Sequence, residues 1–240
     1  MPNFLSSDQT NRSDSPGHAP EKMIWGQLRP HIVMPKLLKQ AFARVSRPAF
    51  VPPCYQECCY HDDPIPLNEK GNKQRFLLAP LTVAKLLVHV DFETIMDKKV
   101  LILGGGTGYS TALLGQMDID CIMIESCPEL AAQATENLMS YPKVVVKSAP
   151  LDSIDNVVSE DSFDIIFIDG GAAESIPQSL LNKLTPTGFL LALQQQTISS
   201  SAELSLCRGV KILATGNKSI LFDAWVPVNQ DFSTSIAFSF

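Results

Sequence analysis

A glycine-rich turn constrains the fold of this chain more than any other feature. Residues 104–108 read Gly-Gly-Gly-Thr-Gly and stand between the apolar run 100–103 and a helix-like segment that begins at Tyr109. Glycine permits tight turns and lets a ligand approach the backbone closely. In an open α/β sheet, such a turn at the carboxyl end of the first central strand is a ligand-binding position. The sequence therefore predicts an α/β domain with a ligand crevice at this turn.

The segments around the turn alternate between strand-like and helix-like patterns. Apolar runs predict strands at 100–103, 121–124, 144–146, 163–168 and 188–193, and helices are expected at 81–90, 109–116, 128–139 and 176–184. This alternation predicts a mostly parallel sheet with right-handed crossovers. Two later runs, 210–214 and 219–228, flank Gly216-Asn217-Lys218 and predict an antiparallel hairpin. We expect a Rossmann-like α/β fold with helices on both faces, in its methyltransferase variant.

The N-terminal part differs in character from the rest. Residues 1–20 are rich in Ser, Asp, Asn and Pro, which is typical of a disordered tail. One domain is expected over 21–240, and its first part, 21–95, is predicted to be a cap of helices and loops. Helical apolar spacing from 23 to 45 is interrupted by Pro30 and Pro35, which predicts two short helices. The proline-rich stretch 46–74 is expected to be an extended loop layer.

Charge and cysteine content narrow the classes of partner. The net charge is −6 and no long basic run occurs, which disfavours nucleic acid as a partner. The sequence has no apolar run long enough for a bilayer and no secretory signal, so we expect a cytoplasmic protein without membrane contact. The six cysteines are expected to be free thiols. Cys54, Cys58, Cys59 and His61 do not follow a standard zinc spacing, so no metal is expected.

The spacing of the turn and two acidic residues indicate the ligand. The pattern is G-x-G-x-G, with Tyr109 where the dinucleotide pattern would need a third glycine, and this favours an adenosyl ligand without a pyrophosphate over NAD. Glu125 ends the second predicted strand, where a carboxylate can accept hydrogen bonds from ribose hydroxyls. Asp169 ends the fourth strand at the same crevice. Either could instead be an ordinary strand-end residue. Residues expected to bind S-adenosylmethionine are Gly104, Gly105, Gly106, Thr107, Gly108, Tyr109, Glu125, Ser126 and Asp169.

Several motifs in the same order resemble those of the protein-L-isoaspartate O-methyltransferase family, especially its alphaproteobacterial-type members. Residues 25–30 (Trp-Gly-Gln-Leu-Arg-Pro) resemble the family's N-terminal Q-(I/L)-R segment, and residues 45–52 (Val-Ser-Arg-Pro-Ala-Phe-Val-Pro) resemble V-P-R-x-x-F-V-P. Residues 60–67 resemble Y-x-D-x-x-(L/I)-P-(L/I), and 225–228 (Trp-Val-Pro-Val) resemble the closing V-P-L strand. The similarity extends over most of the chain after the tail.

The resemblance implies methyl transfer from S-adenosylmethionine to the carboxylate of an isoaspartyl or D-aspartyl residue in a peptide or protein. A carboxylate is anionic near neutral pH and needs no general base, so no catalytic acid or base is expected. The task is to hold the reacting atoms in line. The resemblance also implies a monomer. It places the substrate at four residues of one segment, Leu77, Leu78, Pro80 and Thr82.

Three positions depart from the family pattern. Leu78 stands where the family has a serine that helps place the substrate carboxylate, so Thr82, Arg75 or backbone N–H groups would have to supply a donor. Ile102 replaces an acidic residue near the methionine end of the cofactor, and Ser148-Ala149 replaces a Gly-Asp pair near the adenine. Two alternatives therefore stay open: a different methyl acceptor, or a catalytically silent binding module.

Overall fold

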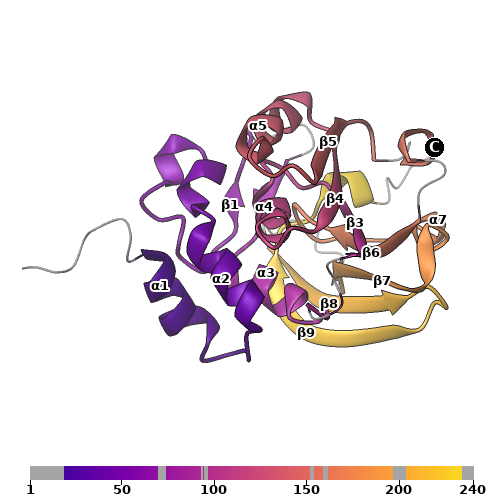
Figure 1. Cartoon of the computed structure of the whole chain (residues 1–240), viewed down its shortest axis with the longest axis horizontal. Coiled ribbons are helices and arrows are strands. Elements are labelled where there is room, and N and C mark those ends of the chain that lie inside the picture. Colours follow the sequence, from indigo (N-terminus) through magenta and orange to yellow (C-terminus); the bar gives the residue numbers. More distant parts are fainter. Residues whose placement is uncertain are drawn as a thin grey trace, which may run out of the picture.

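A seven-stranded sheet forms the centre of the computed structural model, which describes residues 19–69, 74–92, 94, 97–151, 154–158, 162–196 and 204–233. The strand order is β5-β4-β3-β6-β7-β8-β9 (Figure 1). The strands from β5 to β7 run parallel, and β8 and β9 add an antiparallel hairpin at one edge. Their bounds are β3 Lys99–Leu103, β4 Asp120–Glu125, β5 Val144–Ser148, β6 Phe163–Ile168, β7 Leu184–Gln195, β8 Ser205–Leu213 and β9 Lys218–Val226. The predicted Rossmann-like fold with a C-terminal hairpin is confirmed.

Helices cover both faces of this sheet, and strand β3 shows how. Successive side chains of a strand point to opposite faces. Accordingly, Val100 and Ile102 belong to one buried cluster, and Leu101 and Leu103 belong to a second. The first cluster packs against α3 (Pro80–Leu87), α4 (Tyr109–Gly115) and α5 (Pro128–Leu138), and the second against α6 (Ile154–Val157) and α7 (Gln178–Leu181). Continuous apolar runs in the central strands follow from burial on both faces.

The part of the N-terminal cap that precedes α3 packs on the first of these faces, beside α3 and α4 (Figure 1). Helix α1 (Ala19–Met23) continues into a π-helical turn (Ile24–Leu28), and α2 follows at Lys36–Arg44. Residues 1–18 of the predicted tail lie outside the described residues, whereas Ala19 and Pro20 already belong to α1. The stretch 46–74, expected to be an extended loop layer, also contains short regular elements. Short 3-10 turns form at Arg47–Phe50 and Pro53–Tyr55, and β1 (Ile65–Pro66) pairs antiparallel with β2 (Phe76–Leu77).

Two elements have bounds that differ from the predicted ones, and in both cases the cause is pairing between strands that are distant in the sequence. The helix expected at 176–184 is limited to α7, because Leu184 pairs with Phe163 and starts β7. Strand β8 starts at Ser205 rather than 210, because its first residues pair with the far end of β9. Local periodicity cannot detect a partner strand that lies many residues away.

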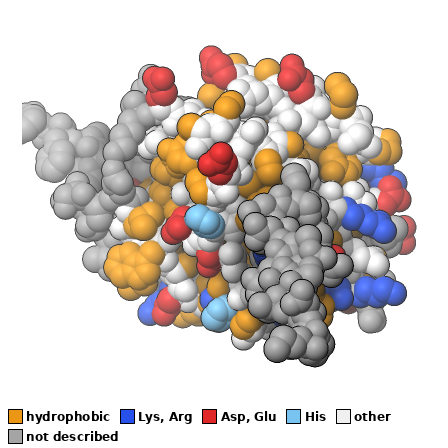
Figure 2. Space-filling model, turned by 90° about the vertical axis from the view of Figure 1, so that its left-hand side faces the viewer, with side chains coloured by type: hydrophobic (Ala, Val, Ile, Leu, Met, Phe, Trp, Pro, Cys, Tyr) orange, Lys and Arg blue, Asp and Glu red, His pale blue; other side chains and the backbone are white. Residues whose placement is uncertain are grey.

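Figure 2 views the side of the molecule that carries the N-terminal cap. Hydrophobic and acidic side chains are interspersed over its coloured part. Exposed Trp25 belongs to this region, and the guanidinium of Arg29 stacks on it at 3.9 Å from the ring centroid. Among the described residues, no helix combines the length and apolar character needed to cross a membrane. All six cysteines are free thiols, as the sequence indicated.

Candidate ligand-binding site

The glycine-rich turn follows β3 directly and requires glycine at several positions. Gly104, Gly106 and Gly108 have φ angles of 71°, 57° and 95°, in the left-handed region that side chains disfavour. At Gly104 the space is also taken, because an added Cβ would lie 2.7 Å from Nδ2 of Asn229. Gly108 precedes α4 and donates its N–H to the carbonyl of Gly105 at 2.9 Å. The turn is therefore a tightly packed element between strand and helix.

Two predicted ligand residues of the turn have structural roles. Thr107 donates its hydroxyl to the carbonyl of Phe50 at 2.6 Å, which ties the turn to the N-terminal cap. Tyr109 is fully buried, with its ring edge-on to Phe42 and Phe50 at centroid distances of 6.4 and 5.5 Å. Burial raises the pKa of Tyr109 to about 12. These side chains fasten the cap to the sheet, and their place in the core explains why the sequence carries them.

Glu125 lies beside the turn, where the sequence placed it. The residue ends β4 and is fully buried. Its carboxylate accepts the N–H groups of Gly106 and Cys127, each at 2.9 Å. Its own carbonyl accepts the N–H of Ala149 at 3.0 Å, which brings the end of β5 to the same edge. The carboxylate thus binds the glycine turn and the loop after β4, while the backbone of Glu125 binds the end of β5.

A buried arginine that the sequence did not assign to this crevice also meets Glu125. Arg75 is fully buried, and its Nε lies 3.2 Å from Oε1 of Glu125. Its Nη2 donates to the hydroxyl of Ser126 at 2.8 Å and is paired with the carboxylate of Asp231, and its Nη1 donates to Oδ1 of Asn229 at 2.9 Å. The resemblance makes Arg75 a candidate donor for the methyl acceptor. The structure instead joins it to the predicted ribose carboxylate.

Asp169 directly follows β6, next to the glycine turn. It is buried, its backbone N–H donates to Leu103 at 2.9 Å, and its Oδ1 accepts the N–H of Gly170 at 2.8 Å. Burial raises the pKa of this carboxyl to about 6, and hydrogen bonds from Ser110 and Gly170 oppose the shift. The backbone of Asp169 therefore contacts the end of β3, directly before the glycine turn.

The raised pKa of Asp169 leads to a prediction on stability. Because the pKa is about 6 when folded and 3.8 when unfolded, the unfolded state releases this proton first. The carboxyl therefore makes the free energy of unfolding fall as pH rises from about 4 to about 6, and its cost stays constant above that range. Asp169→Asn should remove this fall and leave the variant more stable than wild type at pH 7.5, by up to about 3 kcal/mol. Urea unfolding of both proteins from pH 4 to pH 8 measures the difference, and parallel curves would contradict it.

The segment expected to bind the substrate divides between the core and a surface cavity. Leu77 and Leu78 are buried, and the carbonyl of Leu78 accepts Nη2 of Arg47 at 2.7 Å. Thr82 lines a cavity of about 280 Å³ together with Lys85 and residues of β9. Leu77, Leu78 and Pro80 are not among the residues that line this cavity. Among the four predicted residues, Thr82 is the one that faces open space there.

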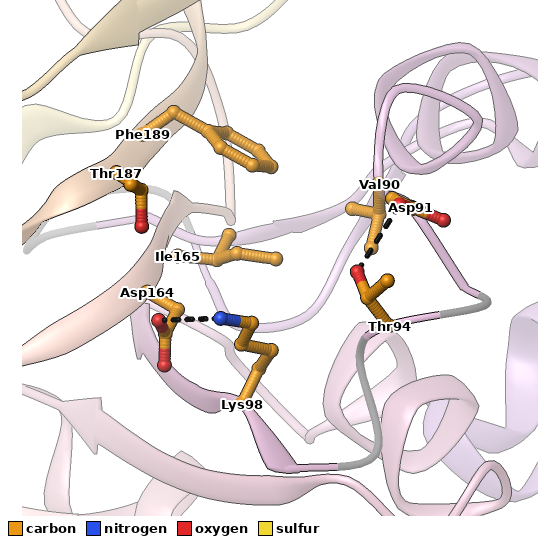
Figure 3. Close-up of a pocket in the computed structure, with 8 residues that line it drawn as sticks. All are labelled: Val90, Asp91, Thr94, Lys98, Asp164, Ile165, Thr187 and Phe189. Atoms are coloured by element: carbon orange, nitrogen blue, oxygen red, sulfur yellow. Dashed lines mark hydrogen bonds and ion pairs between the residues drawn. The ribbon is translucent and has the colours of Figure 1, made fainter.

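A separate cavity of about 260 Å³ lies at the opposite end of the sheet (Figure 3). Lys98, directly before β3, and Asp164, near the start of β6, line it, and Nζ of Lys98 lies 3.3 Å from Oδ1 of Asp164. Ligands of open α/β sheets bind at the carboxyl ends of the strands. This cavity is therefore not the ligand crevice that the glycine turn defines.

Fold and site together define the class of protein, that of the class I S-adenosylmethionine-dependent methyltransferases. A crystal structure described as a beta-aspartate methyltransferase from Plasmodium falciparum in complex with S-adenosyl-L-homocysteine matches with a TM-score of 0.71. The match covers 91% of this chain and 100% of that one at 17% identity. A second structure, a protein-L-isoaspartate O-methyltransferase, matches with a TM-score of 0.63 over 89% of this chain and 67% of its own, again at 17% identity. At these identities the matches establish the fold.

Sequence comparison establishes the family. The model of the protein-L-isoaspartate(D-aspartate) O-methyltransferase family matches residues 18–217. The protein-L-isoaspartate O-methyltransferase of Gloeobacter violaceus is 33% identical over 172 residues, which cover 70% of this chain and 79% of that protein. That of Methanoculleus marisnigri is 27% identical over 172 residues, covering 72% of this chain and 75% of that protein. The chain belongs to the protein-L-isoaspartate(D-aspartate) O-methyltransferase family, and its cofactor class is S-adenosylmethionine.

The backbone of the crevice suits an adenosyl ligand, but side chains occupy the position of its ribose in this arrangement. Glu125 already accepts two backbone N–H groups and the guanidinium of Arg75. Leu67 packs directly over Gly106, where an added Cβ would collide with it. Ribose hydroxyls could reach the carboxylate only after Arg75 had left. The structure therefore does not accommodate the cofactor in this form.

The two departures near the cofactor also have structural explanations. Ile102 is fully buried in the cluster under the N-terminal cap, so an acidic side chain there would be surrounded by apolar groups. Ala149 retains the backbone link to Glu125 while lacking a polar side chain. At both positions the backbone of the crevice is retained, and the polar side chain that the family has there is replaced by an apolar one.

Proposed function

We propose that this chain transfers the methyl group of S-adenosylmethionine to the carboxylate of an isoaspartyl or D-aspartyl residue in a damaged protein. Membership of the family is the observation that carries the proposal, since the family model covers residues 18–217. The glycine turn beside a buried glutamate supports the same cofactor class. We further propose that the chain acts as a cytoplasmic monomer without nucleic acid or membrane as a partner.

The acceptor carboxylate needs a donor, and Thr82 is the best candidate. Arg75, another candidate donor, is already paired with Glu125 and Asp231. Thr82 is on the first turn of α3 and lines the cavity formed with β9, whose charged lining residues are Lys85 and the aspartates Asp62, Asp63 and Asp223. We therefore assign the peptide to this cavity, with the hydroxyl of Thr82 hydrogen-bonded to its carboxylate.

Methyl transfer to paired peptides tests the proposed function. One peptide contains an isoaspartyl residue, and its control has the same sequence with normal aspartate. With labelled S-adenosylmethionine at saturating concentration, base-labile methyl ester should form on the isoaspartyl peptide alone. Equal labelling of both peptides, or labelling of neither, would refute the proposed substrate. Labelling of small carboxylic acids instead would indicate a different acceptor.

Thr82→Val should weaken use of the isoaspartyl peptide. The variant keeps the shape of the side chain and removes the hydroxyl, and a hydrogen bond to a charged group contributes about 1.5–3 kcal/mol, or a factor of about 10 or more. We expect the KM for peptide to rise about tenfold while cofactor affinity is unchanged. Thr185→Val is the matched control, because Thr185 bonds to Asp164 at the other end of the sheet. Equal KM values for the two variants would exclude this role of Thr82.

A further inference from the structure

We propose that Arg75 is an internal plug of the adenosyl site, and that the cofactor binds only after this side chain has left Glu125. The proposal rests on the proposed function, because it takes an adenosyl ligand to be the occupant of the crevice. It adds a property that family membership does not supply. In the form described, the position of the ribose hydroxyls is taken by a guanidinium that the chain itself provides.

The charges of the plug favour the closed form. Glu125 is fully buried, and a buried carboxylate needs a counter-charge or several hydrogen bonds. Arg75 supplies this charge, with Nε at 3.2 Å from Oε1 and 3.3 Å from Oε2. Ribose hydroxyls are neutral, so an incoming ligand would exchange a charged partner for an uncharged one. This exchange weakens binding.

The C-terminal turn holds Arg75 from the other side. Asp231, in the 3-10 turn Gln230–Phe232, pairs with Nη2 of Arg75. Asn229 accepts Nη1 at 2.9 Å through Oδ1, and its Nδ2 donates to the carbonyl of Asp169 at 3.0 Å. The guanidinium is thus held between two carboxylates, an arrangement of strong charge-assisted hydrogen bonds. Release of the plug must break contacts both to the end of β4 and to the C-terminal turn.

The stem of Arg75 also fills the notch that the glycines open. An added Cβ at Gly170 would lie 2.8 Å from Cδ of Arg75, and one at Gly104 would lie 3.5 Å from its Nε. Glycine at such positions allows close approach to the backbone. Here the side chain that approaches is Arg75. Affinity for the ligand is therefore reduced by the fraction of molecules in which the plug is open.

Titration calorimetry with S-adenosylhomocysteine, which carries no transferable methyl group, tests the plug. Arg75→Met removes the guanidinium and keeps an unbranched side chain. Asp231→Asn leaves Arg75 paired with Glu125 and removes the ion pair between Arg75 and Asp231. This variant tests the plug even if Arg75→Met does not fold. Arg208→Met is the matched control, because Arg208 forms an exposed ion pair with Asp223 at 3.3 Å on the hairpin.

For an open form that is about a tenth of the wild-type population, we expect Arg75→Met to bind S-adenosylhomocysteine about tenfold more tightly than wild type, and Asp231→Asn about threefold more tightly. Arg208→Met should bind as wild type does. If neither site variant gains affinity, whether wild type binds tightly or no protein binds, the plug is refuted. If a variant gains affinity but no protein methylates the isoaspartyl peptide, the plug stands and the proposed function fails.

Discussion

Arg47→Met should lower the free energy of unfolding by about 2–6 kcal/mol, one of the two largest effects that we expect from a single substitution. Arg47 is fully buried, and its Nε and Nη2 donate to the carbonyls of Cys59 and Leu78 at 2.5 and 2.7 Å. Its guanidinium also lies 4.7 Å from the ring centroid of Tyr109. One side chain therefore joins the cap, the segment before α3 and the start of α4.

Methionine can fill the volume of Arg47 but cannot donate a hydrogen bond. Two buried carbonyls would lose their charged donor, and a buried acceptor without a partner costs about 1–3 kcal/mol. Urea unfolding measures the loss, with Arg44→Met as the control, because Arg44 is exposed at the end of α2. The control should change stability by less than about 0.5 kcal/mol. A similarly small loss for Arg47→Met would mean that the cost of burying the charge offsets its hydrogen bonds.

The central sheet and the glycine turn were predictable because their signals are local. A strand buried on both faces reads as a continuous apolar run, as 100–103 and 163–168 do. The acid at the end of the second strand could be placed at the turn, because parallel strands bring their carboxyl ends to one edge. The structure brings Glu125 to Gly106 in this way.

The side chains that occupy the crevice could not be predicted from local sequence patterns. Arg75 meets Glu125 across 50 residues of sequence and Asn229 across 154 residues. No periodicity relates such positions, and a lone arginine in a loop is ordinarily solvated. The clue in the sequence was indirect: Arg75 immediately precedes the segment in which leucine replaces the family's serine. Its pairing with Glu125 could be found only from the fold.

The second large effect concerns the buried pair of Arg75 and Glu125. Glu125→Gln leaves the buried guanidinium paired with Asp231, and Arg75→Met leaves Glu125 with the backbone donors of Gly106 and Cys127. Breaking a buried pair on one side typically costs about 3–5 kcal/mol, because a charge stays behind without its partner. We expect a loss in this range for each single variant, measured by urea unfolding at pH 7.5.

The double variant decides how the two charges depend on each other. Once Arg75→Met and Glu125→Gln are combined, neither charge remains, so the loss should be smaller than the sum of the single losses by about 2–3 kcal/mol. The exposed pair Arg208–Asp223, 3.3 Å apart, provides the control cycle and should couple by less than about 1 kcal/mol. Additive losses at Arg75 and Glu125 would show that the pair does not hold the crevice closed. A large coupling measures the interaction that an adenosyl ligand has to displace.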